Sequence, residues 1–205
     1  MTSNEVLYRG PLITKATKAL ILLHGRGGTA RGIMSLADNF DDADFYIAAP
    51  QAPNSTWYPY SFMTEEKLNE PYLLSSIESI KNLIDETAKY IPLHQIYIMG
   101  FSQGACLALE VSTRFAAKYG GVIAFTGGLI GDTINDKKYH GNFEGTKVFI
   151  GNSDQDPHVP LVRSEQSKKL MEKLGADVTL KVYKGMAHTI NEDEINWVKK
   201  NIFVL

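Results

Sequence analysis

A serine lies between two glycines in the segment Gly100-Phe101-Ser102-Gln103-Gly104. The apolar residues 95–100 predict a strand that leads into this segment, and good helix formers follow it. The pattern Gly-x-Ser-x-Gly at a strand-to-helix junction holds the serine on a sharp, strained turn, where larger side chains at the glycine positions would collide with backbone. Such a turn presents the hydroxyl of Ser102 as a nucleophile. It also aims the backbone amide of Gln103 at the same space, as a donor to a developing oxyanion.

A serine nucleophile needs a base, and the base needs an orienting carboxylate. The expected chain order is serine, acid, histidine, each in a loop after a strand. His188, in GMAHTI, follows the last predicted strand and is the expected base. The acid candidates that follow earlier strands are Asp132, Asp154 and Asp156. We favour Asp156 because Pro157 stiffens its loop, whereas Asp154 can serve as a turn residue.

The second oxyanion donor is expected in the glycine-rich loop HGRGG, residues 24–28, after the first strong strand. We assign it to the backbone amide of Arg26. A glycine-rich loop can also bind phosphate at a helix N-terminus. The spacings of the phosphate-loop and dinucleotide motifs are both absent here, so we set phosphate binding aside.

These residues need a scaffold of alternating strands and helices. Apolar runs predict strands over residues 18–25, 45–50, 95–100, 121–128, 146–152 and 178–185, with a further short strand near residues 5–10. Helical periodicity covers residues 71–90, 104–120, 162–176 and 192–203. The alternation predicts an α/β fold with a mostly parallel central sheet and helices on both faces. The last strand alternates in polarity and is placed near an edge, whereas residues 51–70 resist assignment.

Composition limits the classes of protein to consider. The chain has 205 residues, 44% of them hydrophobic, and a net charge of -2, which fits one domain over residues 1–205 and disfavours a nucleic-acid partner. No apolar run is long enough for an integral membrane segment. With Cys106 as the one cysteine, no intramolecular disulfide can form, and we expect a cytoplasmic location.

With these residues placed, the chain resembles the small carboxylesterase/phospholipase family of α/β-hydrolases, which includes the acyl-protein thioesterases. The resemblance rests on LLHGRGG, GFSQGA, SDQDPHVP and GMAHTI, with APQAP as a weaker match. It implies Ser102 as nucleophile, Asp156 as acid, His188 as base and the amides of Arg26 and Gln103 as the oxyanion hole. No metal, cofactor or large cap domain is implied. Serine at the elbow argues against the dienelactone hydrolases, which carry cysteine there.

Two features depart from the family pattern: HGRGG replaces the HGLGD type of the eukaryotic thioesterases, and WYPYSF differs from the family's segment there. The expected substrate is therefore a small-molecule ester, with thioester or lysophospholipid as the alternative, and depalmitoylation does not carry over. The predicted substrate-binding residues are Trp57, Tyr58, Tyr60, Phe62 and Met186. Residues 51–70 are the expected cover of the site, and apolar surface around its mouth would support a homodimer.

Two other readings compete with a serine hydrolase. A ligand-binding module on a hydrolase frame would not need serine, acid and histidine together. A metal-dependent hydrolase would use His24, His158 and His188 with Asp154, but these lack the short helical spacings of metal motifs.

Overall fold

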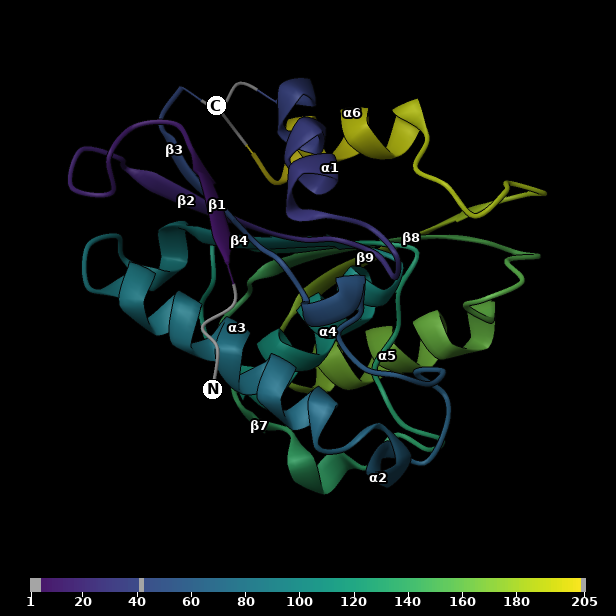
Figure 1. The fold of residues 1–205 in the computed structure, drawn as a ribbon. Coiled ribbons are helices and arrows are strands. Elements are labelled where there is room, and N and C mark those ends of the chain that lie inside the picture. Colours follow the sequence, from purple (N-terminus) through teal and green to yellow (C-terminus); the bar gives the residue numbers. More distant parts are fainter. Residues whose placement is uncertain (1–4, 41–42, 204–205) are drawn as a thin grey trace.

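A seven-stranded sheet forms the centre of the computed structural model, which describes residues 5–40 and 43–203 (Figure 1). The strand order is β1-β3-β2-β4-β6-β8-β9. The outermost strand β1 is antiparallel to β3, and the other neighbouring pairs are parallel. The strands are β1 Val6–Arg9, β2 Lys18–Leu23, β3 Phe45–Pro50, β4 Ile96–Phe101, β6 Gly121–Phe125, β8 Lys147–Ser153 and β9 Asp177–Tyr183. The predicted α/β class is confirmed, including the short first strand and the edge position of the last.

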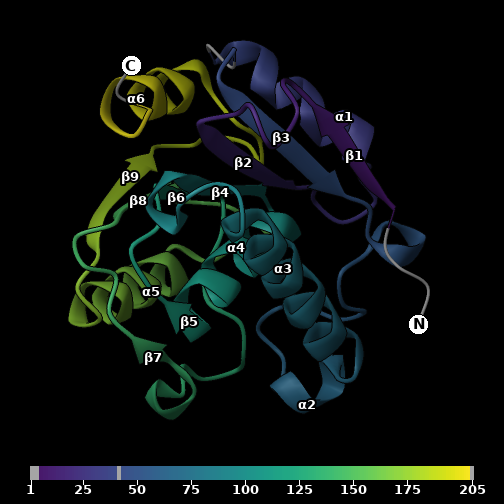
Figure 2. The ribbon, with the colours of Figure 1, turned by 90° about the vertical axis from the view of Figure 1, so that its left-hand side faces the viewer.

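Both faces of the sheet are apolar. Successive residues of a strand point to opposite faces, and these strands are apolar at successive positions. In β2, Ile21 belongs to one buried cluster and Leu22 to the other, and Ile98 and Met99 of β4 divide in the same way. Helices cover each face (Figure 2). On the first lie α3 Tyr72–Ala88, α4 Gln103–Arg114 and α5 Leu161–Lys173, and on the second lie α1 Ala30–Met34 and α6 Glu192–Asn201.

The helices follow from apolar stripes and caps in the sequence. Leu73, Ile77, Ile80 and Ile84 recur at helical spacing in α3 and are buried against the sheet. Asn191 caps the start of α6 through a reciprocal capping box. Its side chain accepts from the backbone amide of Glu194, and the Glu194 carboxylate accepts from the backbone amide of Asn191. Among residues 5–40 and 43–203, no helix is long and apolar enough to cross a membrane.

The parallel strands end at one edge of the sheet, and the loops beyond that edge carry the candidate site residues. β2 leads into the loop of Arg26, β4 into Ser102, β8 into the loop of Asp156, and β9 into the loop of His188. Ligands of open α/β sheets bind at this edge. The topology therefore brings together residues that lie up to 162 positions apart in the chain.

Three regions differ from the sequence-based expectation. The helix after Ser102 ends at Arg114 rather than near residue 120, because β5 Phe115–Ala116 pairs with β7 His140–Gly141 in a second small sheet. The unassigned residues 51–70 contain the 3₁₀ helix Pro53–Ser55 and the one-turn helix α2 Glu66–Asn69. The short helix α1 after the HGRGG loop was not predicted.

Candidate active site

Ser102, at the junction of β4 and α4, has a backbone conformation that residues with a side chain rarely adopt. Its φ is 54° and its ψ is -118°. A Cβ atom on Gly100 would lie 2.3 Å from the carbonyl oxygen of Gly104, and a Cβ on Gly104 would lie 2.1 Å from that of Leu23. Glycine is therefore required on both sides of the serine, for the steric reason expected from the sequence.

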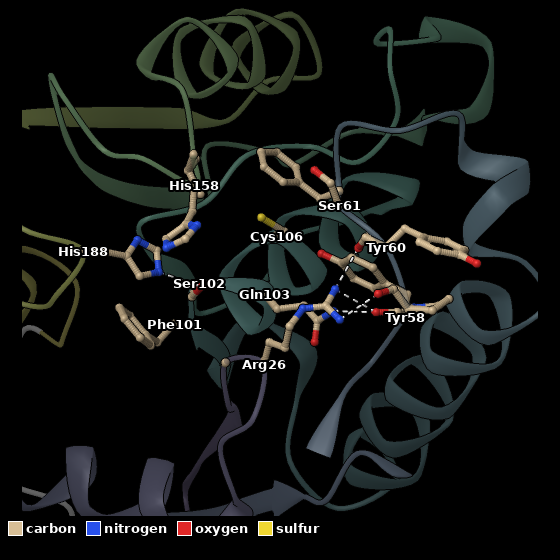
Figure 3. Close-up of a pocket in the computed structure, with 14 residues that line it drawn as sticks. Arg26, Tyr58, Tyr60, Ser61, Phe101, Ser102, Gln103, Cys106, His158 and His188 are labelled. Atoms are coloured by element: carbon tan, nitrogen blue, oxygen red, sulfur yellow. Dashed lines mark hydrogen bonds between the residues drawn. The ribbon is translucent and has the colours of Figure 1, made fainter. Parts of the chain in front are cut away.

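The side chains of Ser102, His188 and Asp156 form one hydrogen-bonded chain, of which Figure 3 shows Ser102 and His188. The Nδ1 atom of His188 lies 2.7 Å from Oδ2 of Asp156, and its Nε2 atom lies 2.8 Å from Oγ of Ser102. An ionised carboxylate only accepts, so Nδ1 carries the proton and the Nε2 lone pair of the neutral ring faces the serine hydroxyl. This is the tautomer that can accept the serine proton.

Asp156 is buried and kept ionised by its hydrogen bonds. Burial opposes ionisation of the carboxyl, but the hydrogen bond from His188 and those from the backbone amides of Val159 and His158 together hold its pKa below the ordinary value. Neither of the other two acid candidates bonds to His188 within the described residues. Asp154 accepts from the amide of Gly185, and the backbone carbonyl of Asp132 accepts from Arg163.

The backbone amide of Arg26 lies in the loop after β2, and that of Gln103 directly follows Ser102. Neither donates a hydrogen bond to another residue within the described parts of the chain. The amide of Gln103 is the first of helix α4, where the helix dipole favours negative charge. Two such donors can stabilise an oxyanion next to Ser102.

The side chains of these two residues bind the same loop. The guanidinium of Arg26 donates to the carbonyl oxygens of Tyr58, Pro59 and Tyr60 at 2.7–2.9 Å. The side-chain amide of Gln103 donates to the carbonyl of Tyr58 at 2.8 Å and accepts from the amide of Trp57 at 3.0 Å. These bonds fix the loop over residues 56–60 as a wall of the site.

A cavity of about 460 Å³ opens beside Ser102 and is lined by three of the predicted substrate-binding residues, Tyr58, Tyr60 and Phe62. Trp57, another predicted substrate-binding residue, does not line this cavity: its side chain is buried beneath the loop, where Nε1 donates to the carbonyl of His24. Met186 does not line the cavity either, since its sulfur accepts from Asn191. The remaining lining residues are Gly25, Arg26, Pro59, Ser61, Phe101, Ser102, Gln103, Cys106, His158, Val159 and His188.

Two of the lining residues that the sequence analysis did not assign to the pocket, Phe101 and His158, have rings that pack against His188. The ring of His158 packs edge-on against that of His188, with centroids 4.8 Å apart. The ring centroid of Phe101 lies 5.2 Å from that of His188. Phe101 directly precedes Ser102 in the sequence, and His158 follows Asp156 by two residues. This closeness to predicted site residues was the available signal.

The four residues of the metal-site alternative do not form a cluster. His24 is buried, which lowers its pKa, and its Nδ1 donates to the carbonyl of Gly25 while its Nε2 accepts from the amide of Ala52. Both ring nitrogens of His24 are therefore occupied in holding the backbone. Within residues 5–40 and 43–203, no group of three or more His, Cys, Asp or Glu side chains could hold a metal ion.

Comparison with known proteins places this chain in a family. The sequence model of the phospholipase/carboxylesterase family matches residues 11–205. Acyl-protein thioesterase 1 of Saccharomyces cerevisiae is 31% identical over 219 aligned positions, which cover 93% of this chain and 95% of the yeast protein.

Solved structures show the same relationship. A phospholipase/carboxylesterase from Dyadobacter fermentans superposes with a TM-score of 0.96 at 46% identity, covering 98% of this chain and 97% of that one. The carboxylesterase of Bacillus cereus, at 22% identity and a TM-score of 0.78, covers 97% of this chain and 93% of its own and shares the fold.

Proposed function

The chain belongs to the phospholipase/carboxylesterase family of α/β-hydrolases and is a carboxylic ester hydrolase, and we propose that it works through an acyl-enzyme on Ser102. One observation carries this proposal. The three side chains are linked in series, with 2.8 Å from serine to histidine and 2.7 Å from histidine to aspartate. No other described histidine has a serine hydroxyl on one ring nitrogen and a carboxylate on the other.

In the first half-reaction, Oγ of Ser102 attacks the ester carbonyl carbon while Nε2 of His188 takes the hydroxyl proton. The tetrahedral intermediate collapses when the bond to the leaving oxygen breaks, and His188 returns the proton to that oxygen. Asp156 keeps the imidazole in its Nδ1-protonated form and stabilises the imidazolium. Water then attacks the acyl-enzyme by the same route and releases the acid and free Ser102.

The amides of Arg26 and Gln103 hold the oxyanion of both tetrahedral intermediates. Loss of one such donor typically raises the barrier by about 2.7–4 kcal/mol. Because both amides are backbone groups, their position depends on the loop that carries them. The side-chain bonds of Arg26 and Gln103 to residues 57–60 support that position.

A thioester is the second candidate substrate. Relatives that align over nearly the whole chain are named acyl-protein thioesterase 1. The same serine attack cleaves a thioester, with a thiol as the leaving group. Nothing in the proposed chemistry requires a metal or cofactor.

The test is hydrolysis of p-nitrophenyl esters from acetate to palmitate, with the matching acyl-thioesters in parallel, for the wild type and Ser102→Ala. We expect ester cleavage that falls by at least about a thousandfold in Ser102→Ala, because triad serines contribute factors of this order or more. EDTA should leave the wild-type rate unchanged. Retention of most activity in Ser102→Ala, or loss with EDTA, would reject the proposed mechanism.

A further inference from the structure

The imidazole of His158 is an open hydrogen-bonding group in the cavity beside Ser102. His158 is exposed and lines the cavity, and within the described residues its ring nitrogens make no hydrogen bond. An imidazole carries an N–H donor in its neutral form and two in its charged form. The side chain of His158 can therefore donate a hydrogen bond to a molecule that enters the cavity.

The loop that carries His158 is fixed by the same carboxylate that orients His188. Oδ1 of Asp156 accepts from the backbone amides of His158 and Val159, both at 2.8 Å, while Oδ2 bonds to the ring of His188. The carbonyl of Val159 accepts from the side-chain amide of Asn152 at 3.0 Å. The two imidazoles therefore have set positions, with ring centroids 4.8 Å apart.

The position of His158 relates it to one part of an ester, the leaving group. In the proposed mechanism the leaving oxygen receives its proton from Nε2 of His188, so the leaving group lies next to that ring. The oxyanion lies toward the amides of Arg26 and Gln103. Figure 3 shows His158 beside His188, with Arg26 on the far side of Ser102. His158 therefore borders the leaving group.

The charges around the cavity favour an anion as the acceptor. Within the described residues, no Asp or Glu lines the cavity, whereas Arg26 does. The guanidinium of Arg26 bonds to three neutral carbonyl oxygens, so no carboxylate neutralises its charge. A hydrogen bond to an ionised acceptor is also stronger than one between neutral groups. An anionic oxygen is therefore the acceptor that gains most from the N–H of His158.

We propose that His158 is a specificity-determining residue that donates a hydrogen bond to an anionic oxygen on the leaving group. A carboxylate is the simplest group that carries such an oxygen. The preferred substrates are therefore esters or thioesters whose alcohol or thiol bears an anion a few bonds from the cleaved bond, rather than esters of plain alkyl alcohols. This inference rests on the proposed function for the identity of the leaving-group side.

The test uses butyrate esters of three alcohols of similar size: 3-hydroxypropanoate, 3-hydroxypropanamide and 3-methylbutanol. The released acid is titrated at constant pH, and kcat/KM of each polar ester is divided by that of the 3-methylbutyl ester. These ratios are compared between the wild type and His158→Phe, which keeps an aromatic ring but has no N–H. The carboxylate ratio should fall by about tenfold, the loss of one hydrogen bond to a charged group, and the amide ratio by about threefold.

His94→Phe is the matched control, because His94 is exposed just before β4, at the other end of that strand from Ser102, and its ratios should equal those of the wild type. Unchanged ratios in His158→Phe would overturn the inference. This includes a uniform loss of rate on all three esters, which would show that His158 acts by positioning His188. An equal fall of the amide and carboxylate ratios would also overturn it, since the charge of the acceptor would then contribute nothing.

A binding measurement separates this inference from the proposed function. Dissociation constants for the carboxylate ester and the 3-methylbutyl ester are measured by calorimetry in Ser102→Ala and in Ser102→Ala/His158→Phe. A preference for the carboxylate ester that weakens in the second protein supports the role of His158. The same preference in both proteins overturns it. If the wild type hydrolyses none of the esters, the proposed function fails, and this measurement still decides the role of His158.

Discussion

Arg26 and Gln103 share one hydrogen-bond acceptor, the carbonyl oxygen of Tyr58, at 2.9 and 2.8 Å. These are the residues whose backbone amides we propose as oxyanion donors. One loop therefore connects these two proposed donors to the wall of the cavity beside Ser102. The bonds from Arg26 and Gln103 hold residues 56–60 in place. The carbonyl of Trp57 also accepts from the hydroxyl of Ser76 at 2.7 Å.

Arg26→Leu tests this connection. The leucine keeps the backbone amide but removes the bonds to three carbonyls. We expect kcat/KM to fall by about 10- to 100-fold, because a small displacement of catalytic groups has effects of this size. Arg31→Leu, at an exposed position of α1, is the control and should keep the wild-type value in the same assay. An unchanged kcat/KM in Arg26→Leu would show that the loop holds its position without the guanidinium.

Asp156→Asn tests the orientation of His188. The amide of asparagine cannot favour the Nδ1-protonated ring as the carboxylate does, so the wrong tautomer faces Ser102. We expect kcat to fall by about 10²–10⁴-fold, in the range of such replacements. Asp154→Asn, two residues away, affects only the bond to the amide of Gly185 and should cost less than about tenfold. Similar losses in the two variants would count against Asp156 as the acid.

Glu194 makes stability depend on pH. Its side chain is buried, one carboxylate oxygen has no partner within the described residues, and burial raises its pKa from 4.5 to about 7 despite the hydrogen bond from the amide of Asn191. Between pH 4.5 and about 7, Glu194 is protonated in the native state but ionised in the unfolded state. This contribution to stability is therefore complete below about pH 4.5 and is lost as the pH rises through about 7.

Glu194→Gln removes this titration. The free energy of unfolding of the variant minus that of the wild type should rise by on the order of 3 kcal/mol between pH 4.5 and pH 8. Urea unfolding across this range measures the difference, in which the other titrating groups cancel. Glu192→Gln, exposed in the same helical turn, controls for the loss of a carboxylate near the helix N-terminus. A difference that is flat with pH, or falls, contradicts the assignment.

The sequence was sufficient for most of the fold because the buried strands are continuous apolar runs that end in turn residues. The sheet is mostly parallel, as expected, and Ser102, Asp156 and His188 therefore lie beyond the same ends of its strands. Their distance from one another in the chain was no obstacle, since each lies directly after a strand that the pattern predicts. Their catalytic roles stay predictions that the experiments above test.

The walls of the cavity were less predictable. Trp57 and Tyr58 are adjacent aromatic residues, and the sequence does not say which of them packs beneath the loop and which lines the cavity. The Arg26 side chain binds backbone carbonyls 32 to 34 residues away, and carbonyl acceptors have no sequence signature. The helix after Ser102 ended early for a similar reason, because a long-range pairing of Phe115–Ala116 with His140–Gly141 outweighs local helix propensity.

The proposed mechanism requires Ser102 to be an activated nucleophile, and covalent trapping tests this requirement without any assumption about the substrate. The wild type is incubated with a fluorophosphonate, which reacts with activated serines, and the intact protein is weighed by mass spectrometry. We expect one adduct, located on the peptide that contains Ser102, absent from Ser102→Ala and formed much more slowly by His188→Ala. An adduct on another residue, or no adduct on a protein that hydrolyses esters, would contradict it.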